Sequence, residues 1–378
     1  MLTLALPLGN TFGWGICGKN LARELARLSE VRLVTGPFEL GDIGDEFEYI
    51  ELQRIAADQE SARLSAPGGP VLQAITGSDL LPMAPGIRGK RNVGYAFIEN
   101  SNLPQASLDN ARGHFDLVVA GSSWCQEVLR AHGLEQTALV FQGVDPATFN
   151  MYENRKTFFD GRFVVFSGGK FEFRKGQDIV MRAFRVLQER HDDVLLVNAW
   201  FNHWEGSFRS MAASPHIAFD YQGGEHCAAI NRLLSENGID LRNVVTLPAK
   251  PQIAMARIYK NTDCGLFPNR CEGGTNLALM EYMACGKPAI VSNSSGHRDM
   301  ANEGNALLLK DLQPLTVSIG GQGTAVWDEP SLDESIEALE WAYQHREALV
   351  DIGEAAGWSM QAHSWAAAAA QFQALLRA

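Results

Sequence analysis

The chain has 378 residues, of which 46% are hydrophobic and 20% are charged. This length and composition are typical of a globular protein with two domains of ordinary size, each able to bury its own core. The formal net charge of −12 argues against a nucleic acid partner, and at a membrane surface it favours peripheral contact at most.

The N-terminal region has no targeting or spanning pattern. No apolar stretch approaches the roughly 20 residues of a membrane-spanning helix, and the first six residues lack the basic start of a signal peptide. The six cysteines are scattered, with no C-x-x-C pair and no histidine at zinc spacing. We therefore expect a cytoplasmic protein whose cysteines are reduced packing residues.

The chain begins with a β-α-β pattern. Leu2–Leu8 is predicted to be a strand, residues 9–18 a Gly-rich loop, Asn20–Leu28 a helix and Val31–Thr35 a second strand. The loop lacks the glycine spacing of a dinucleotide site, and no acidic residue ends the second strand. An NAD-dependent oxidoreductase is therefore disfavoured.

In the rest of the first half, some segments show clear secondary-structure patterns and others do not. Residues 38–90 show little periodicity, and Tyr49–Leu52 is the strand predicted there. Arg91–Asn100 is a clear strand that ends in polar residues, and a buried strand with a Ser-capped helix follows within 115–131. The segment 139–149 indicates a strand, a turn and a cap that fixes a hinge before a linker.

The second half repeats the alternation of strands and helices. Strands are predicted at Phe163–Ser167, Val194–Val197, Val244–Leu247, Cys264–Phe267 and Ala289–Ser292. Helices are predicted at Asp178–Gln188, Gln252–Tyr259, Leu332–Gln344, Glu347–Gly357 and from Ser364 to Ala378. Such alternation is typical of parallel sheets covered by helices.

A loop with two glycines follows the strand Phe163–Ser167. Gly169 lets the backbone approach a ligand, and Lys170 and Lys175 can supply positive charge to a diphosphate leaving group. Arg174 can replace either lysine. The irregular segment 198–220 carries Trp200, His203 and Trp204, which could line a pocket but which we expect to pack under a loop. We likewise expect His297 to be an ordinary loop residue.

Residues 268–288 are the most informative stretch. The apolar strand Cys264–Phe267 leads into a turn that contains Gly274, and a helix is predicted from about Asn276 to Gly286. Thr275 and Asn276 are N-cap residue types. Free backbone N–H groups and the helix dipole at such a turn bind anions, and phosphate is the expected ligand.

Two carboxylates flank this turn. Glu272 precedes it and Glu281 lies in the first two turns of the helix, so both are expected to face the ligand crevice. Carboxylates repel phosphate but accept hydrogen bonds from vicinal hydroxyls, one pair on a ribose and another on a hexose. The pattern therefore favours a nucleotide sugar over a bare nucleotide.

The stretch resembles the Glu-rich donor motif of retaining GT-B glycosyltransferases of the family 4 type, the glycosyl transferases group 1. The resemblance implies that Glu281 holds the nucleotide ribose and that Glu272 contacts the sugar hydroxyls. Eight residues separate the two glutamates here, where the family most often has seven, so the assignment is safer for Glu281. The implied diphosphate ligands are the backbone amides of Gly274, Thr275, Asn276 and Leu277.

Other segments carry the same resemblance. Residues 139–149 are similar to the Gly-Val-Asp-x-x-x-Phe pattern that ends the first domain in this family, and the spacing of Lys170 and Lys175 also matches. By the same resemblance, Gly15 would let the backbone approach the diphosphate. The family often has a sugar-contacting histidine after the strand 91–100. This chain has none, so Glu99 or Asn100 would stand in.

Some of the residues expected to contact the acceptor have two interpretations. Glu99 is expected either to accept a hydrogen bond from the acceptor hydroxyl or to cap a helix. Asn10, Phe12 and Trp14 are assigned to acceptor binding with Asn100, and the two aromatic rings would either stack on a sugar or pack within their loop.

The resemblance implies a GT-B fold, which consists of two facing Rossmann-like α/β domains. Residues 1–155 would form an acceptor-binding domain that is completed by a helix in 361–378 crossing back to it. Residues 156–360 would bind the nucleotide sugar.

The predicted function is transfer of a sugar from a nucleotide diphosphate sugar to an acceptor hydroxyl. The predicted catalytic residues are Lys170, Lys175, Glu272 and Glu99, and we expect neither a metal nor a cofactor because side chains and a helix N-terminus neutralise the leaving group. A UDP-sugar is favoured and a GDP-sugar is possible. The acceptor would be a glycan, a lipid-linked sugar or a small molecule, as in polysaccharide biosynthesis.

Retention at the anomeric carbon is implied by the resemblance alone. Two alternatives stay open at this point: a nucleotide-sugar epimerase of the same fold, and a non-catalytic protein that binds nucleotide sugars.

Overall fold

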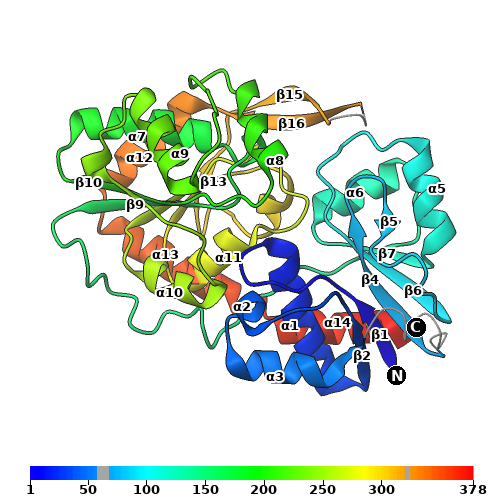
Figure 1. Ribbon diagram of the computed structural model, residues 1–378. Coiled ribbons are helices and arrows are strands. Elements are labelled where there is room, and N and C mark those ends of the chain that lie inside the picture. The colour runs from blue at the N-terminus through cyan, green and yellow to red at the C-terminus, as the bar shows by residue number, and fades with distance from the viewer. Residues whose placement is uncertain (58–67, 320–322, 378) are drawn as a thin grey trace.

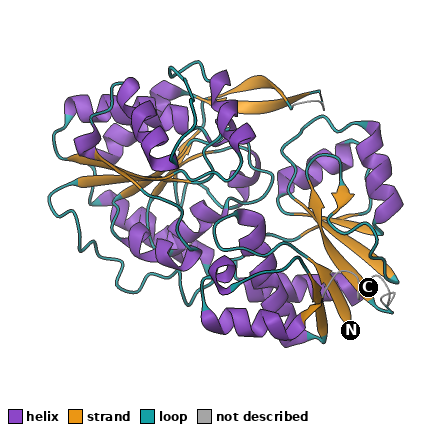
Figure 2. Cartoon of the chain, viewed as in Figure 1, coloured by secondary structure: helices purple, strands orange, loops and turns teal. Residues whose placement is uncertain are grey.

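The computed structural model describes residues 1–57, 68–319 and 323–377, and it contains two parallel sheets with helices on their faces (Figures 1 and 2). The first sheet has the strand order β3-β2-β1-β4-β6-β7-β8, with the short β5 antiparallel to β4. Its strands are β1 Leu2–Ala5, β2 Val31–Val34, β3 Ala56–Ala57, β4 Pro70–Thr76, β5 Leu81–Pro82, β6 Arg91–Ala96, β7 Leu117–Ala120 and β8 Thr137–Leu139. Its helices are α1 Gly13–Leu28, α2 Leu40–Ile43, α3 Glu46–Ile55, α5 Gln105–His114 and α6 Ser123–Ala131.

The second sheet has the order β11-β10-β9-β12-β13-β14. Its strands are β9 Phe163–Gly168, β10 Val194–Ala199, β11 Val244–Thr246, β12 Cys264–Phe267, β13 Ala289–Ser292 and β14 Leu307–Leu309. The helices of this half are α7 Gln177–Arg190, α8 Glu205–Arg209, α9 His226–Glu236, α10 Gln252–Lys260, α11 Leu277–Ala284, α12 Leu332–Gln344 and α13 Ala348–Met360. Every residue of β9, β12 and β13 is buried, as expected for parallel strands that are covered on both faces.

Three predictions about elements of the first domain were wrong or incomplete. Tyr49–Leu52 lies in helix α3 rather than in a strand, because the Asp45 side chain caps α3 by accepting hydrogen bonds from two backbone N–H groups. Helix α1 begins at Gly13, seven residues before the predicted start at Asn20. The central strand β4, which pairs with β1 and β6, was not predicted.

A two-stranded antiparallel hairpin, β15 Leu312–Ser318 and β16 Thr324–Pro330, was also not predicted. It extends from the second domain toward the first (Figure 1).

The last helix, α14 Trp365–Arg377, crosses back to the first domain as predicted and lies beside α1 (Figure 1). Phe372 packs edge-on against Tyr95 at 4.8 Å between ring centroids, and Gln373 Nε2 donates to the Leu28 carbonyl at 2.8 Å. A Cβ at Gly143 would meet the backbone of Trp365 at 2.3 Å, so the hinge segment has a glycine where α14 begins.

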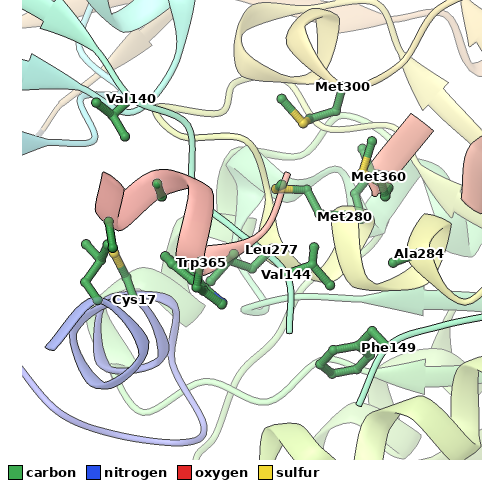
Figure 3. Packing of buried hydrophobic residues seen from close by; sticks show 14 of the residues in the cluster. Cys17, Val140, Val144, Phe149, Leu277, Met280, Ala284, Met300, Met360 and Trp365 are labelled. Atoms are coloured by element: carbon green, nitrogen blue, oxygen red, sulfur yellow. The ribbon is translucent and has the colours of Figure 1, made fainter. Parts of the chain in front are cut away.

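The hydrophobic cluster around α1, α11 and α14 spans both domains. Figure 3 shows side chains from the first domain, the crossing segment and the second domain in this cluster, among them Cys17, Val144, Trp365, Leu277 and Met280. All six cysteines are free, and burial confirms the predicted packing role for five of them; Cys227 is half-buried. Within the described ranges, no helix has the length and hydropathy needed to cross a bilayer.

Candidate active site

A cleft of about 620 Å³ lies where the C-terminal ends of strands from both sheets face each other. This is where open parallel sheets usually bind ligands. Thirteen of the predicted site residues line it: Asn10, Phe12, Trp14, Glu99, Gly169, Lys170, Arg174, Lys175, Glu272, Gly274, Asn276, Leu277 and Glu281.

Three predicted site residues are not among those that line the cleft. Gly15 lies in the first turn of α1, where a Cβ would come within 2.6 Å of the Gly9 backbone, so close packing accounts for this glycine. Asn100 is fully buried, and its Oδ1 accepts from the Asn102 amide at 2.8 Å. The Thr275 amide is directed at Gln142 Oε1 at 3.4 Å.

Glu272 lies at the centre of the charged side chains in the cleft. Its carboxylate accepts from Lys175 Nζ at 2.5 Å, from Arg174 Nη1 at 3.0 Å and from the Asn269 amide group. Burial alone would raise the pKa of Glu272, but the charges of Lys175 and Arg174 outweigh burial and lower the pKa to about 2. Glu272 is therefore an ionised hydrogen-bond acceptor at neutral pH.

Three cations of the cleft, Lys170, Arg174 and Lys175, are paired with carboxylates. Arg174 Nη2 lies 2.5 Å from Glu172 Oε1 and 3.2 Å from Glu99 Oε1, and Lys170 Nζ lies 2.8 Å from Glu172 Oε2. Burial lowers the pKa of Lys175 from its ordinary value, although Glu272 opposes that shift. Glu99 thus joins the first domain to an ionic network that belongs to the second.

Glu281 has a different environment from Glu272. Its Oε1 accepts from Gln252 Nε2 at 2.5 Å, and its Oε2 lies 3.4 Å from the Tyr259 hydroxyl. Burial raises the pKa of Glu281 to about 8, and these hydrogen bonds only partly oppose the shift. The two glutamates of the motif therefore face one cleft in opposite protonation states at neutral pH.

The glycine turn between them is packed against the first domain. A Cβ at Gly273 would lie 2.6 Å from the Ile98 carbonyl oxygen, and one at Gly274 would lie 3.0 Å from the Phe97 ring. Ser122 Oγ also donates to the Gly273 carbonyl at 2.8 Å. The sequence predicted that the backbone amide of Gly274 binds a diphosphate. In the structure, Gly273 and Gly274 also permit close contact between the domains.

The helix N-terminus at the turn is held by a buried histidine. Asn276, the N-cap of α11, has a φ of 61°, and its Nδ2 hydrogen-bonds with His297 Nε2 at 2.9 Å. His297 Nδ1 in turn lies 3.1 Å from Ser292 Oγ. Burial lowers the pKa of His297 to about 4, so the ring is neutral and orients Asn276. The prediction of an ordinary loop residue therefore missed this positioning contact.

Aromatic rings form much of the cleft wall. The ring centroids of Trp14 and Phe97 lie 4.3 Å apart. The Phe12 ring meets those of His203 and Trp204 edge-on, with centroids 6.2 and 6.1 Å away. Sequence reasoning expected Trp200, His203 and Trp204 to be packing residues. This holds for Trp200, which is buried, but it is incomplete for the other two, because they line the cleft.

Sequence reasoning missed several other lining residues, namely Gln142, Lys250, Gln252 and Tyr259. Gln252 and Tyr259 lie in α10, and their contacts to Glu281 join residues 29 and 22 positions apart. No local motif marks residues of this kind.

The segment that contains the two glutamates is similar to a known family of proteins. A family model described as glycosyl transferases group 1 matches residues 207–319, which include both Glu272 and Glu281. A comparison with the sequences of curated proteins found no match.

Solved structures resemble the whole chain at low sequence identity. Sucrose-phosphate synthase from Thermosynechococcus elongatus superposes with a TM-score of 0.70 at 15% identity, covering 100% of this chain and 98% of that one. HepE from Anabaena, in complex with UDP-glucose, gives 0.69 at 15% identity, covering 100% and 99%. The catalytic domain of starch synthase IV from Arabidopsis thaliana, bound to ADP and acarbose, gives 0.64 at 12% identity, covering 100% and 98%. The chain therefore has the two-domain GT-B fold, and its residues 207–319 match the glycosyl transferases group 1 model.

Proposed function

We propose that the protein is a glycosyltransferase that moves a sugar from a nucleotide diphosphate sugar to an acceptor hydroxyl. The observation that carries the proposal is the pair Glu272 and Glu281, which line one cleft on either side of a glycine turn within the segment that matches the family model. One glutamate is poised for the sugar and the other for the ribose.

Groups that line the cleft on the side of the second domain support the proposed position of the donor. Glu281 receives the ribose hydroxyls beside Gln252 and Tyr259. The diphosphate lies at the turn and the N-terminus of α11, where backbone N–H groups favour an anion. Glu272 accepts hydrogen bonds from the transferred sugar, since its carboxylate is ionised.

Neutralisation of the leaving group supplies the catalysis in this proposal. As the anomeric C–O bond breaks, charge develops on the departing phosphate oxygen, and Lys170, Arg174 and Lys175 line the cleft within reach of it. These three cations stand beside the carboxylates of Glu99, Glu172 and Glu272, so an entering diphosphate competes for groups that are already held in place. In this proposal the leaving group is neutralised by these side chains, and no metal ion is required.

The stereochemical part of the proposal is retention, in the manner of the family 4 type. The new C–O bond forms on the face that the phosphate leaves, and the leaving phosphate oxygen takes the acceptor proton. Glu272 accepts hydrogen bonds from Lys175, Arg174 and Asn269, which favours a role in binding the sugar over one as a nucleophile or acid.

The acceptor lies against the first domain in this proposal. Phe12, Trp14 and Phe97 offer ring faces or edges to a sugar, and Glu99 offers a carboxylate to an acceptor hydroxyl. A glycan or a lipid-linked or small glycoside meets these requirements, as in polysaccharide biosynthesis.

Donor turnover without an acceptor tests the proposal. We expect slow release of one nucleoside diphosphate when UDP-, GDP- and ADP-sugars are screened in the presence of EDTA, with products identified by mass. A UDP-sugar is favoured, since the similar HepE was crystallised with UDP-glucose. Isomerisation of a donor would instead establish an epimerase, and donor binding with no product under any acceptor would establish a binding protein.

A further inference from the structure

We propose that the hairpin β15–β16 sets the position of Glu99, and that Trp327 is the positioning residue through which it does so. The proposal rests on the proposed function, because it assigns the placement of a carboxylate on the acceptor side of the same cleft. It is carried by contacts between the hairpin and the loop that follows β6, in residues 97–102.

Three hydrogen bonds join the hairpin to this loop. Trp327 Nε1 donates to the Glu99 carbonyl oxygen at 2.7 Å, and the Val326 amide donates to Ser101 Oγ at 2.7 Å. Asn102 Nδ2 donates to the Thr324 carbonyl at 2.8 Å. The hairpin belongs to the second domain and the loop to the first, so these bonds cross the boundary between the domains beside the cleft.

The base of the hairpin is fixed to the segment that carries Glu272. Arg270 has no exposed side-chain surface, pairs with Asp178 at 2.8 Å and also pairs with Glu329 at the end of β16. The Asp328 amide donates to the Arg270 carbonyl at 3.1 Å, and Ser294 Oγ donates to Asp328 Oδ2 at 2.8 Å. A buried, charge-paired arginine of this kind holds its neighbours rigidly.

The hairpin therefore connects the two carboxylates on the two sides of the cleft. Its base is bonded to Arg270, two residues before Glu272, and its Trp327 is bonded to Glu99 itself. The Glu99 side chain is 42% exposed, and its carboxylate makes one ion pair, with Arg174 at 3.2 Å. A side chain this exposed depends on its backbone for its location, and Trp327 fixes that backbone.

The hydrogen bond between Trp327 and the Glu99 backbone predicts that substitutions of these two residues have coupled effects on transfer. Trp327 is half-buried and packs against the core of the second domain, so Trp327→Phe keeps an aromatic ring and removes the N–H donor. Loss of one such hydrogen bond should slow transfer about fivefold, equivalent to ~1 kcal/mol.

The test measures transfer with the full-length protein and the donor and acceptor found in the screen. Four proteins form a cycle: wild type, Trp327→Phe, Glu99→Gln and the double variant. Trp358→Phe is the matched control, because Trp358 is exposed on α13 and its Nε1 bonds Glu354 at 3.4 Å, away from the cleft. Thermal midpoints are recorded for every variant.

We expect Trp327→Phe to lower kcat for transfer about fivefold, with nucleoside diphosphate affinity and thermal midpoint close to wild type. In the Glu99→Gln background the same change should alter kcat less than twofold, since the two residues act as one unit. Trp358→Phe should not alter transfer.

Equal effects of Trp327→Phe in both backgrounds would overturn the proposal, as would wild-type transfer by Trp327→Phe or by Glu99→Gln. A structural role alone would lower the thermal midpoint and act additively. Failure of the proposed function is separate, since it appears as no donor turnover by wild type.

Discussion

If Glu281 holds the ribose as proposed, we expect the affinity for nucleotide to depend on pH through its carboxyl group. Burial raises the pKa of its carboxyl to about 8, so the group is mostly protonated at pH 7. A ribose diol donates two hydrogens, and an ionised carboxylate accepts both of them, whereas a protonated carboxyl group has less acceptor capacity. Binding therefore carries the cost of ionising Glu281 below pH 8, and this cost disappears above pH 8.

The size of the effect follows from the titration. With a pKa of about 8, roughly one tenth of the carboxyl groups are ionised at pH 7 and roughly nine tenths at pH 9. Affinity that depends on the ionised form should therefore rise about tenfold over this interval, which is ~1.4 kcal/mol. Glu281→Gln has no proton to lose, so its affinity should lack this rise.

Calorimetric titration of the nucleoside diphosphate at pH 6, 7, 8 and 9 measures both proteins. The ratio of the Glu281→Gln dissociation constant to that of wild type cancels the titration of the nucleotide phosphates. The ratio should grow about tenfold from pH 7 to pH 9. A ratio that stays constant over this range would refute the placement of the ribose on an ionised Glu281.

Stability without nucleotide should change in the opposite direction. The folded pKa of Glu281 lies above its ordinary 4.5, so the unfolded chain loses this proton first as pH rises. Its contribution to the free energy of unfolding is present in full below pH 4.5 and is lost as pH rises to about 8. The thermal midpoint of Glu281→Gln should therefore gain on that of wild type over this window, and parallel midpoints would contradict the burial argument.

Two further predictions concern the leaving group and the domain contact. Lys175→Ala should lower turnover about a hundredfold while donor affinity changes much less, because the cation acts mainly on charge that develops as the bond breaks; steady-state kinetics would refute this if KM rose and kcat did not fall. Gly273→Ala places a Cβ 2.6 Å from the Ile98 carbonyl and should lower both the thermal midpoint and transfer. Its control is Gly113→Ala, since a Cβ there meets no atom within 4 Å, and equal midpoints for the two variants would count against the tight contact.

The sequence predicted elements well where burial leaves a periodic pattern. Strands β12 and β13 are buried on both faces and appear as continuous apolar runs, and helix α12 has its Ser331 cap beside a regular apolar stripe. Helix α3 was misread because two of its large apolar residues are exposed, Phe47 at 80% and Ile50 at 47%, so its pattern does not report the buried face. Only tertiary contacts distinguish such a helix from a strand.

The candidate site was likewise predictable only where it depends on a local sequence motif. Glu272 and Glu281 lie in one local motif, and their presence in the cleft could be predicted from the turn and helix between them. Their protonation states could not be predicted, because that of Glu272 depends on Lys175, 97 residues away, and that of Glu281 depends on its burial in the folded chain. The contacts that decide the chemistry are long-range, and a single sequence contains no local trace of them.

The crossing of α14 back to α1 has a consequence for synthesis. The ribosome makes α1 more than 330 residues before it makes α14, yet these helices pack on one another and share one core. The first half of a nascent chain therefore emerges with the α1 surface that α14 later covers still open to solvent. Completion of the first domain therefore waits until α14 has been made, after the helices and strands of the second domain.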